Sequence, residues 1–142
     1  MAFTYPWACA ITLGVTLLLS CAAGWVGWQR LRLGIKAPEM TSVEPGDPHR
    51  DEPFKRAYRI QMNTQEGALV FLPALWICAL GWNDPLAGAL GGIWIAARVW
   101  YALAYAADPT SRRPAFLLSQ VIYVLTWLGG AAGLVLAAFR QG

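Results

Sequence analysis

Four long apolar stretches, separated by short polar segments, set the pattern of this chain. They cover approximately residues 5–29, 54–82, 85–107 and 114–139. A helix needs about 20 predominantly apolar residues to cross a bilayer, and each stretch is long enough once its flanks are included. The pattern therefore predicts four membrane-spanning helices.

The ends of these stretches carry helix signals. Each stretch begins close to a proline, a residue that suits the first helical turn: Pro6, Pro53, Pro85 and Pro114. Asp51 and Asp84 precede two of these prolines and are expected to act as N-caps. Only the segment 36–50 is long enough to be an irregular loop. We predict an all-α membrane protein, a four-helix transmembrane bundle that forms one domain over residues 1–142.

Composition supports this prediction and excludes several classes of site. The chain is 57% hydrophobic and 13% charged, with a mean hydropathy of +0.42. The first stretch lacks a basic segment before it and continues past Cys21, so it is expected to be a retained helix, not a cleaved signal peptide. The cysteines show no metal-like or redox-like spacing, and the single histidine, His49, cannot build a metal site unaided, so no metal site is expected.

The distribution of basic residues predicts the orientation. They concentrate in residues 30–59 and again at Arg112 and Arg113, whereas the turn at residues 82–85 has none. By the positive-inside rule, loops 30–56 and 108–113 are expected to be cytoplasmic and both termini outside. Orientation accounts for these charges, so nucleic acid is not an expected partner. The short loops favour a bacterial inner membrane.

Three polar residues interrupt the start of the second stretch. Arg59, Asn63 and Glu66 are spaced by four and then three residues, which places them on one helical face. A charged group at bilayer depth costs roughly 2.5–3.5 kcal/mol on insertion scales. Such residues usually face a ligand, a partner or a water-filled cavity. The alternative is that Arg59 and Glu66 form a buried ion pair that only ties the bundle together.

The third stretch repeats this pattern. Arg98, Tyr101 and Tyr105 follow at spacings of three and four, and Arg112 and Arg113 lie just beyond the stretch. Together with Arg30, these residues are expected to converge at the cytoplasmic side of the membrane. Two alternatives stay open: the two tyrosines could form an interfacial aromatic belt, and Arg112 and Arg113 could be positive-inside anchors.

A pocket with this inventory would suit a small zwitterionic peptide. Guanidinium groups bind carboxylates in bidentate fashion, and one glutamate suits an ammonium group. Asn63 and Gln61 can pair with amides, and tyrosine hydroxyls can donate to a carboxylate or a thiolate. Glutathione, which has two carboxylates, one ammonium, two amides and a thiol, is the expected ligand.

These residues also carry a resemblance to a known family. The segment FKRAYRIQMNTQE, followed by an apolar run, and the later segments ARVWYALAY and SRRPAF resemble the MAPEG superfamily, the membrane-associated proteins of eicosanoid and glutathione metabolism. The most specific match is an aromatic residue, a basic pair and R-x-Q-x-N-x-x-E. The resemblance covers essentially the whole chain.

The resemblance implies a homotrimer that binds glutathione between neighbouring subunits near the cytoplasmic face. It implies that Arg59 pairs with a glutathione carboxylate and that Arg98 has a structural or ligand-binding role. It also assigns glutathione contacts to six further residues: Arg30, Gln61, Asn63, Glu66, Tyr101 and Tyr105. The arginine that activates the thiol corresponds to Arg112, or to Arg113 in an alignment with one gap. One departure is Gly67, where the leukotriene-C synthases have a tyrosine.

The function expected from these residues is a membrane-bound glutathione transferase or peroxidase with no metal. A guanidinium close to the sulfur would stabilise a thiolate, which attacks a lipophilic substrate that enters from the membrane lipid. One alternative is a non-catalytic lipid- or glutathione-binding protein of the same family. A four-helix multidrug transporter is the other, but it usually has an acidic residue in its first span, and residues 5–28 have none.

Overall fold

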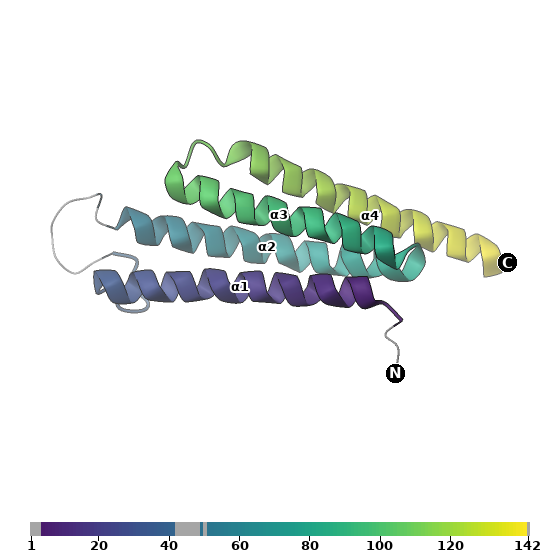
Figure 1. The fold of residues 1–142 in the computed structure, drawn as a ribbon, viewed down its shortest axis with the longest axis horizontal. Helices are drawn as coiled ribbons and strands as arrows, with labels where there is room; N and C mark the ends of the chain where they lie inside the picture. Colours follow the sequence, from purple (N-terminus) through teal and green to yellow (C-terminus); the bar gives the residue numbers. More distant parts are fainter. Residues whose placement is uncertain (1–3, 42–48, 50, 142) are drawn as a thin grey trace.

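The chain folds into four long helices that form a bundle (Figure 1). The structure is a computed structural model that describes residues 4–41, 49 and 51–141, with side chains up to residue 139. The helices are α1 (Pro6–Leu33), α2 (Glu52–Gly81), α3 (Asp84–Ala107) and α4 (Arg113–Gln141). All four are long and apolar enough to cross a membrane. The prediction of an all-α, multi-pass membrane protein is confirmed. Residues 42–48 and 50 of the predicted loop lie outside the described residues.

The two central helices separate the two outer ones. Helices α2 and α3 each pack against α1 on one side and against α4 on the other, and within the described residues α1 and α4 do not touch. The end of α1, the start of α2 and the α3–α4 connection lie at the same end of the bundle (Figure 1). This is the end that carries the concentrations of basic residues, as the topology predicts.

The apolar half of α2 packs against both α3 and α4. Toward α3, Phe71 stacks on Trp94 with a centroid separation of 4.4 Å and an interplanar angle of 3°. Toward α4, the backbones meet at Gly81 and Gly133, where a Cβ added to Gly133 would stand 2.6 Å from the carbonyl carbon of Gly81. Small residues of this kind let membrane helices approach closely. These contacts fix the three helices around the polar half of α2.

The expectation that Asp84 is the N-cap of α3 is wrong. Asp84 is the first residue of α3, and the N-cap of that helix is Asn83, whose side chain accepts from the backbone N–H of Leu86 at 2.9 Å. The Asp84 carboxylate instead accepts from the backbone N–H groups of Trp7 and Ala8 at 3.0 and 2.9 Å. It therefore caps the start of α1, because the chain fold brings the two helix starts together.

Candidate functional site

A polar cleft opens between α2, α3 and α4 at the basic end of the bundle. It has a volume of about 360 Å³. Its walls are formed by Arg59, Asn63, Tyr101, Arg112, Arg113 and Phe116. Five of these six residues are among those that the sequence marked as candidates, and they come from three helices and the α3–α4 connection. We call this the polar cleft.

Local sequence explains how these side chains reach one place. Arg59 and Asn63 are one helical turn apart on α2, so both face the same neighbour. Arg113 begins α4, and Phe116 lies three residues later on that helix. The free backbone N–H groups at the start of a helix favour an anion, and here they lie next to two arginines. The polar cleft is therefore strongly electropositive.

The guanidinium groups in the polar cleft have no carboxylate to neutralise them. Among the residues that the structure describes, Arg59, Arg112 and Arg113 form no ion pair with an aspartate or a glutamate, and all three are exposed. Arg112 lies over the ring of Tyr105, with its Cζ 4.6 Å from the ring centroid, and interacts with the Tyr101 hydroxyl. The alternative of a buried Arg59–Glu66 ion pair is wrong, because both side chains are exposed and no ion pair joins them.

Arg98 supports the polar cleft from behind. Its side chain is 1% exposed, and it donates from Nη1 to the Asn63 Oδ1 at 2.7 Å. Its guanidinium Cζ lies 5.1 Å from the ring centroid of Trp94 and 5.8 Å from that of Tyr101. A desolvated guanidinium against aromatic rings makes favourable cation–π contacts. Arg98 is thus fixed in position, and it fixes the Asn63 amide in turn.

The missing side chain of Gly67 provides the room for Arg98. A Cβ built at Gly67 would stand 2.8 Å from Cζ of Arg98 and closer still to its Nη2. The buried guanidinium of α3 therefore occupies the space that a side chain at position 67 of α2 would need. Gly67 thus has a specific packing partner, the guanidinium of Arg98.

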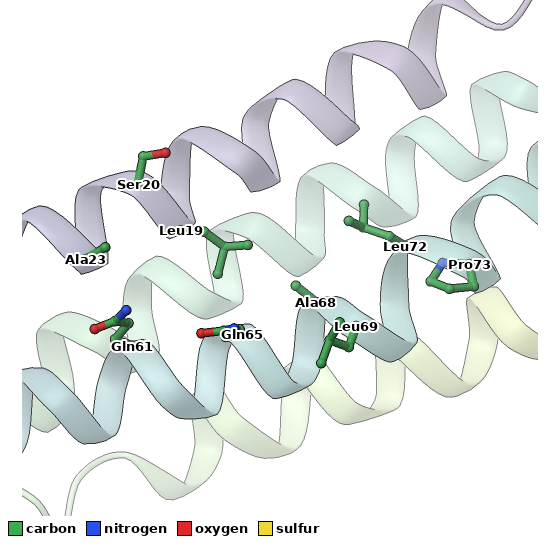
Figure 2. A pocket seen from close by; sticks show the side chains of 9 residues that line it. All are labelled: Leu19, Ser20, Ala23, Gln61, Gln65, Ala68, Leu69, Leu72 and Pro73. Carbon is green, nitrogen blue, oxygen red and sulfur yellow. The ribbon is translucent and has the colours of Figure 1, made fainter.

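Five candidate residues do not line the polar cleft: Arg98 and Tyr105 are buried behind its walls, and the other three lie elsewhere. Glu66 is on the same face of α2 as Asn63, one turn deeper in the membrane, but does not line the cleft and is exposed. Gln61 lines a groove of about 610 Å³ between α1 and α2, together with Gln65 and residues of α1 (Figure 2). Arg30, at the end of α1, donates to the carbonyl of Glu39 at 2.9 Å and lies 4.7 Å from the ring centroid of Phe54.

Gln61 and Arg30 border the same side of α1. The groove that holds Gln61 contacts α1 at Ala23, and the hollow around Arg30 contacts it at Gly27. Residues 23, 27 and 30 are spaced by four and three, so they share one helical face. The candidate residues therefore fall into two sets on two faces of the subunit: the polar cleft and the α1–α2 side.

Sequence reasoning missed one residue that lines the polar cleft and one packing contact behind it. Phe116 lines the polar cleft, and its spacing of four from Arg112 is the signal that would have placed it beside that arginine. The packing of Arg98 against Gly67 has no sequence signal, because it depends on the distance between α2 and α3. Tyr105 is buried beneath Arg112 and does not line the cleft.

Comparisons with known proteins agree on the kinship of the chain. The sequence model of the MAPEG family matches residues 6–132. Human microsomal glutathione S-transferase 2 is 31% identical over 124 residues, which cover 84% of this chain and 79% of the human protein. The mouse protein of the same name is 31% identical over 115 residues, 78% of this chain and 73% of its own. An uncharacterized protein of Synechocystis sp. is 30% identical over 123 residues, 87% of this chain and 84% of its own.

Proposed function

The chain belongs to the MAPEG family, and we propose from that premise that it is a membrane-bound glutathione-dependent transferase or peroxidase. Two of its relatives are named microsomal glutathione S-transferases. The observation that carries the proposal is the polar cleft, where three arginines that pair with no carboxylate of the described residues gather beside an amide and a phenol. Unneutralised guanidinium groups at the edge of a bilayer call for an anionic ligand.

The chemistry of the polar cleft suits glutathione. In this proposal Arg59 binds a carboxylate and Asn63, held by Arg98, pairs with a backbone amide of the peptide. Glu66, on the same face of α2, is the carboxylate available to the ammonium group. The volume of about 360 Å³ is within the range of small-molecule sites, at its lower end. A peptide of three residues is a suitable size for such a cleft.

Arg112 or Arg113 would activate the thiol. The thiolate is the nucleophile, and a nearby cation stabilises it relative to the thiol. Lowering a thiol pKa from about 8.5 by about two units takes about 2.7 kcal/mol, a reasonable contribution from one arginine in a partly desolvated site. Tyr101, which interacts with Arg112, can donate a hydrogen bond from its hydroxyl to the thiolate. The thiol proton is released to solvent.

Two reactions follow from an activated thiolate. With an electrophilic carbon, a C–S bond forms and the leaving group departs with its electron pair. With a lipid hydroperoxide, sulfur attacks the O–O bond, the lipid leaves as an alcohol after taking a proton, and the oxidised sulfur condenses with a second glutathione to give the disulfide and water. In both cases the lipophilic co-substrate would reach the polar cleft from the bilayer.

The candidate residues on the α1–α2 side indicate how neighbouring subunits would share one glutathione site. Arg30 and Gln61 do not reach the polar cleft of their own subunit. In a ring of identical subunits, two different faces of the molecule meet at every interface. We therefore propose a homotrimer in which the α1–α2 side of one subunit adds Arg30 and Gln61 to the glutathione bound in its neighbour's polar cleft.

The distribution of basic residues supports an orientation of the protein in the membrane. We propose that residues 1–142 form a single MAPEG-like domain in a bacterial inner membrane. The basic end of the bundle, with loops 30–56 and 108–113, would face the cytoplasm and the termini the outside. This orientation gives the polar cleft access to cytoplasmic glutathione.

Purified protein assayed with glutathione and 1-chloro-2,4-dinitrobenzene, and separately with a lipid hydroperoxide, tests the proposal. Arg59→Gln should raise the glutathione dissociation constant tenfold or more, since a hydrogen bond to a charged group contributes about 1.5–3 kcal/mol. Whichever of Arg112→Gln and Arg113→Gln removes the activating cation should shift the acid limb of the kcat/KM profile to higher pH by about two units.

Arg32→Gln is the matched control, since this arginine is at the end of α1 over Trp28 and does not line the polar cleft. Glutathione binding without turnover of either substrate would leave the non-catalytic binding protein as the function. Full activity in all three cleft variants would refute the site assignment.

A further inference from the structure

A second groove, lined by α1, α2 and α3, lies on the other side of Arg98 from the polar cleft. Its deeper part is a cavity of about 310 Å³. One wall is formed by α1 through Leu18, Ala22 and Trp25, and the other by α3 through Ala102, Leu103 and Ala106. This part lies within the membrane-spanning segments, and its lining is almost entirely apolar.

The groove becomes polar at the basic end of the bundle. A second cavity of about 260 Å³ shares Trp25 and Ala106 with the first and adds Gln29, Glu52 and Arg56. Leu18 and Gln29 are eleven residues apart on α1, so the two cavities together extend over about 16 Å at 1.5 Å per residue. Trp25 stands at the transition, in the position that tryptophan takes at membrane interfaces. We call the whole feature the α1–α3 groove.

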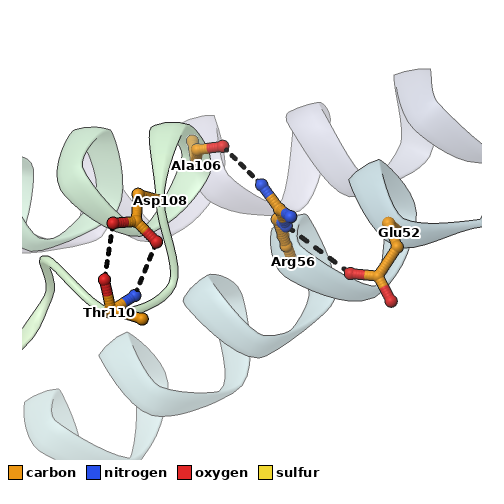
Figure 3. A network of polar contacts seen from close by, with 5 residues as sticks. All are labelled: Glu52, Arg56, Ala106, Asp108 and Thr110. Carbon is orange, nitrogen blue, oxygen red and sulfur yellow. Dashed lines mark hydrogen bonds and ion pairs between the residues drawn. The ribbon is translucent and has the colours of Figure 1, made fainter. Parts of the chain in front are cut away.

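Two charges of opposite sign stand at its polar end. Arg56 Nε lies 3.6 Å from a carboxylate oxygen of Glu52, and its Nη1 donates to the backbone carbonyl of Ala106 at 3.2 Å (Figure 3). Arg56 and Glu52 partly balance one another's charge. This end nevertheless offers a guanidinium to an anion and a carboxylate to a cation. A zwitterionic group matches this arrangement better than a purely anionic one.

Gln29 provides an independent sign that a ligand belongs here. Its side chain is 95% buried, since only 5% is exposed, yet its Oε1 has no hydrogen-bond partner among the described residues. A buried polar atom left unsatisfied costs about 1–3 kcal/mol, so such atoms usually have a partner. Because Gln29 lines the polar end of the groove, a donor placed there would satisfy it. The groove thus lacks a hydrogen-bond donor next to a Glu52 carboxylate.

We propose that the α1–α3 groove is a specific site for a phospholipid with a primary ammonium headgroup, phosphatidylethanolamine in chemical class. An acyl chain would fill the apolar part between α1 and α3. The phosphate would accept from Arg56, and the ammonium would donate to Glu52 and to Gln29 Oε1. Phosphatidylcholine has the same charges but no N–H donor, so it cannot satisfy Gln29. This selectivity separates a built site from ordinary annular lipid.

The test uses the full chain, delipidated in detergent and equilibrated with equimolar dioleoylphosphatidylethanolamine and dioleoylphosphatidylcholine. The lipid retained after washing is measured by mass spectrometry, and stability by tryptophan fluorescence. Wild type should retain about one phosphatidylethanolamine per chain, with at least fivefold enrichment over phosphatidylcholine, and should melt several degrees higher with the former. A third arm with palmitate asks whether a free fatty acid displaces the phospholipid.

Ala102→Phe should fill the groove and abolish this retention, whereas Ala96→Phe, an exposed position on the same helix, should not. Gln29→Leu, which leaves the chain channel open, should reduce the enrichment to within twofold of unity. If Ala102→Phe does not fold, Gln29→Leu still tests whether the site selects the headgroup. Equal retention of both phospholipids, displacement of the phospholipid by palmitate, or no retained lipid at all would overturn the proposal.

Discussion

The guanidinium of Arg98 occupies the space in which a side chain at Gly67 would stand. The two residues lie on different helices, and a Cβ at position 67 would come within 2.8 Å of Cζ of Arg98. The same guanidinium donates to Asn63 at 2.7 Å, so the absence of a side chain on α2 governs the position of an amide that lines the polar cleft.

Gly67→Ala should therefore weaken glutathione binding without touching the ligand. The added methyl group would push the Arg98 guanidinium away from Asn63, and overpacking of this kind costs about 1–3 kcal/mol. Loss of one positioned amide should raise the glutathione dissociation constant about tenfold, measured by calorimetry. Gly92→Ala, on α3 with no atom within 4 Å of the new methyl, is the control and should bind normally. Unchanged binding in Gly67→Ala would show that Asn63 does not need Arg98.

The sequence predicted the fold because span length and hydropathy are local properties. It also predicted the meeting of Arg59 and Asn63, since a spacing of four fixes a shared helical face. Gln61, only two residues from either, points about 200° away around the helix and faces α1 instead. That separation was readable from the spacing.

Other features depended on how far apart the helices lie. The packing of Arg98 against Gly67 and the capping of α1 by Asp84 both join residues distant in sequence. No pattern within one helix encodes such distances. The sequence thus identified which residue types gather at the basic end, while only the tertiary structure divides them between the polar cleft and the α1–α2 side.

Asp84→Ala should destabilise the start of α1, a different helix from the one that carries the mutation. The carboxylate accepts from the N–H groups of Trp7 and Ala8, and losing an N-cap costs about 0.5–2 kcal/mol. Amide hydrogen exchange should speed up in the first turn of α1. Asn83→Ala removes the cap of α3 alone and serves as the comparison. Faster exchange confined to α3 in Asp84→Ala would contradict the inter-helix cap.

Gly133→Ala should destabilise the protein although alanine favours the helix, because the added methyl group would disturb the packing of α4 against α2. Alanine is the better helix former by about 1 kcal/mol, yet its methyl group at position 133 would meet the carbonyl oxygen of Gly81 at 2.7 Å. Because the neighbour is backbone and cannot rotate aside, we expect a net loss of about 1–3 kcal/mol in unfolding free energy. Gly24→Ala on α1, with open space around it, should be neutral or stabilising. Thermal unfolding in detergent would measure both, and equal melting temperatures would refute close α2–α4 packing.

Asp108 makes the connection that carries Arg112 sensitive to acid. Its carboxylate accepts from the hydroxyl and the backbone N–H of Thr110 at 2.5 and 2.9 Å (Figure 3). These hydrogen bonds, and the nearby charge of Arg56, hold the pKa of this carboxyl below its usual value. A carboxyl with a lowered pKa in the folded state stabilises that state above the unfolded pKa of about 3.9, and the stabilisation is lost as pH falls through the folded value.

Asp108→Ala should consequently lower the melting temperature by a constant amount between pH 8 and pH 5. Below about pH 4 the Asp108 carboxyl of the unfolded chain takes up a proton, so the gap between variant and wild type should narrow as pH falls through the lowered pKa of the folded state. Thr110→Ser, which keeps the hydroxyl, should follow the wild-type curve. A gap of the same size at every pH would mean that Asp108 supports the connection through packing and not through its charge.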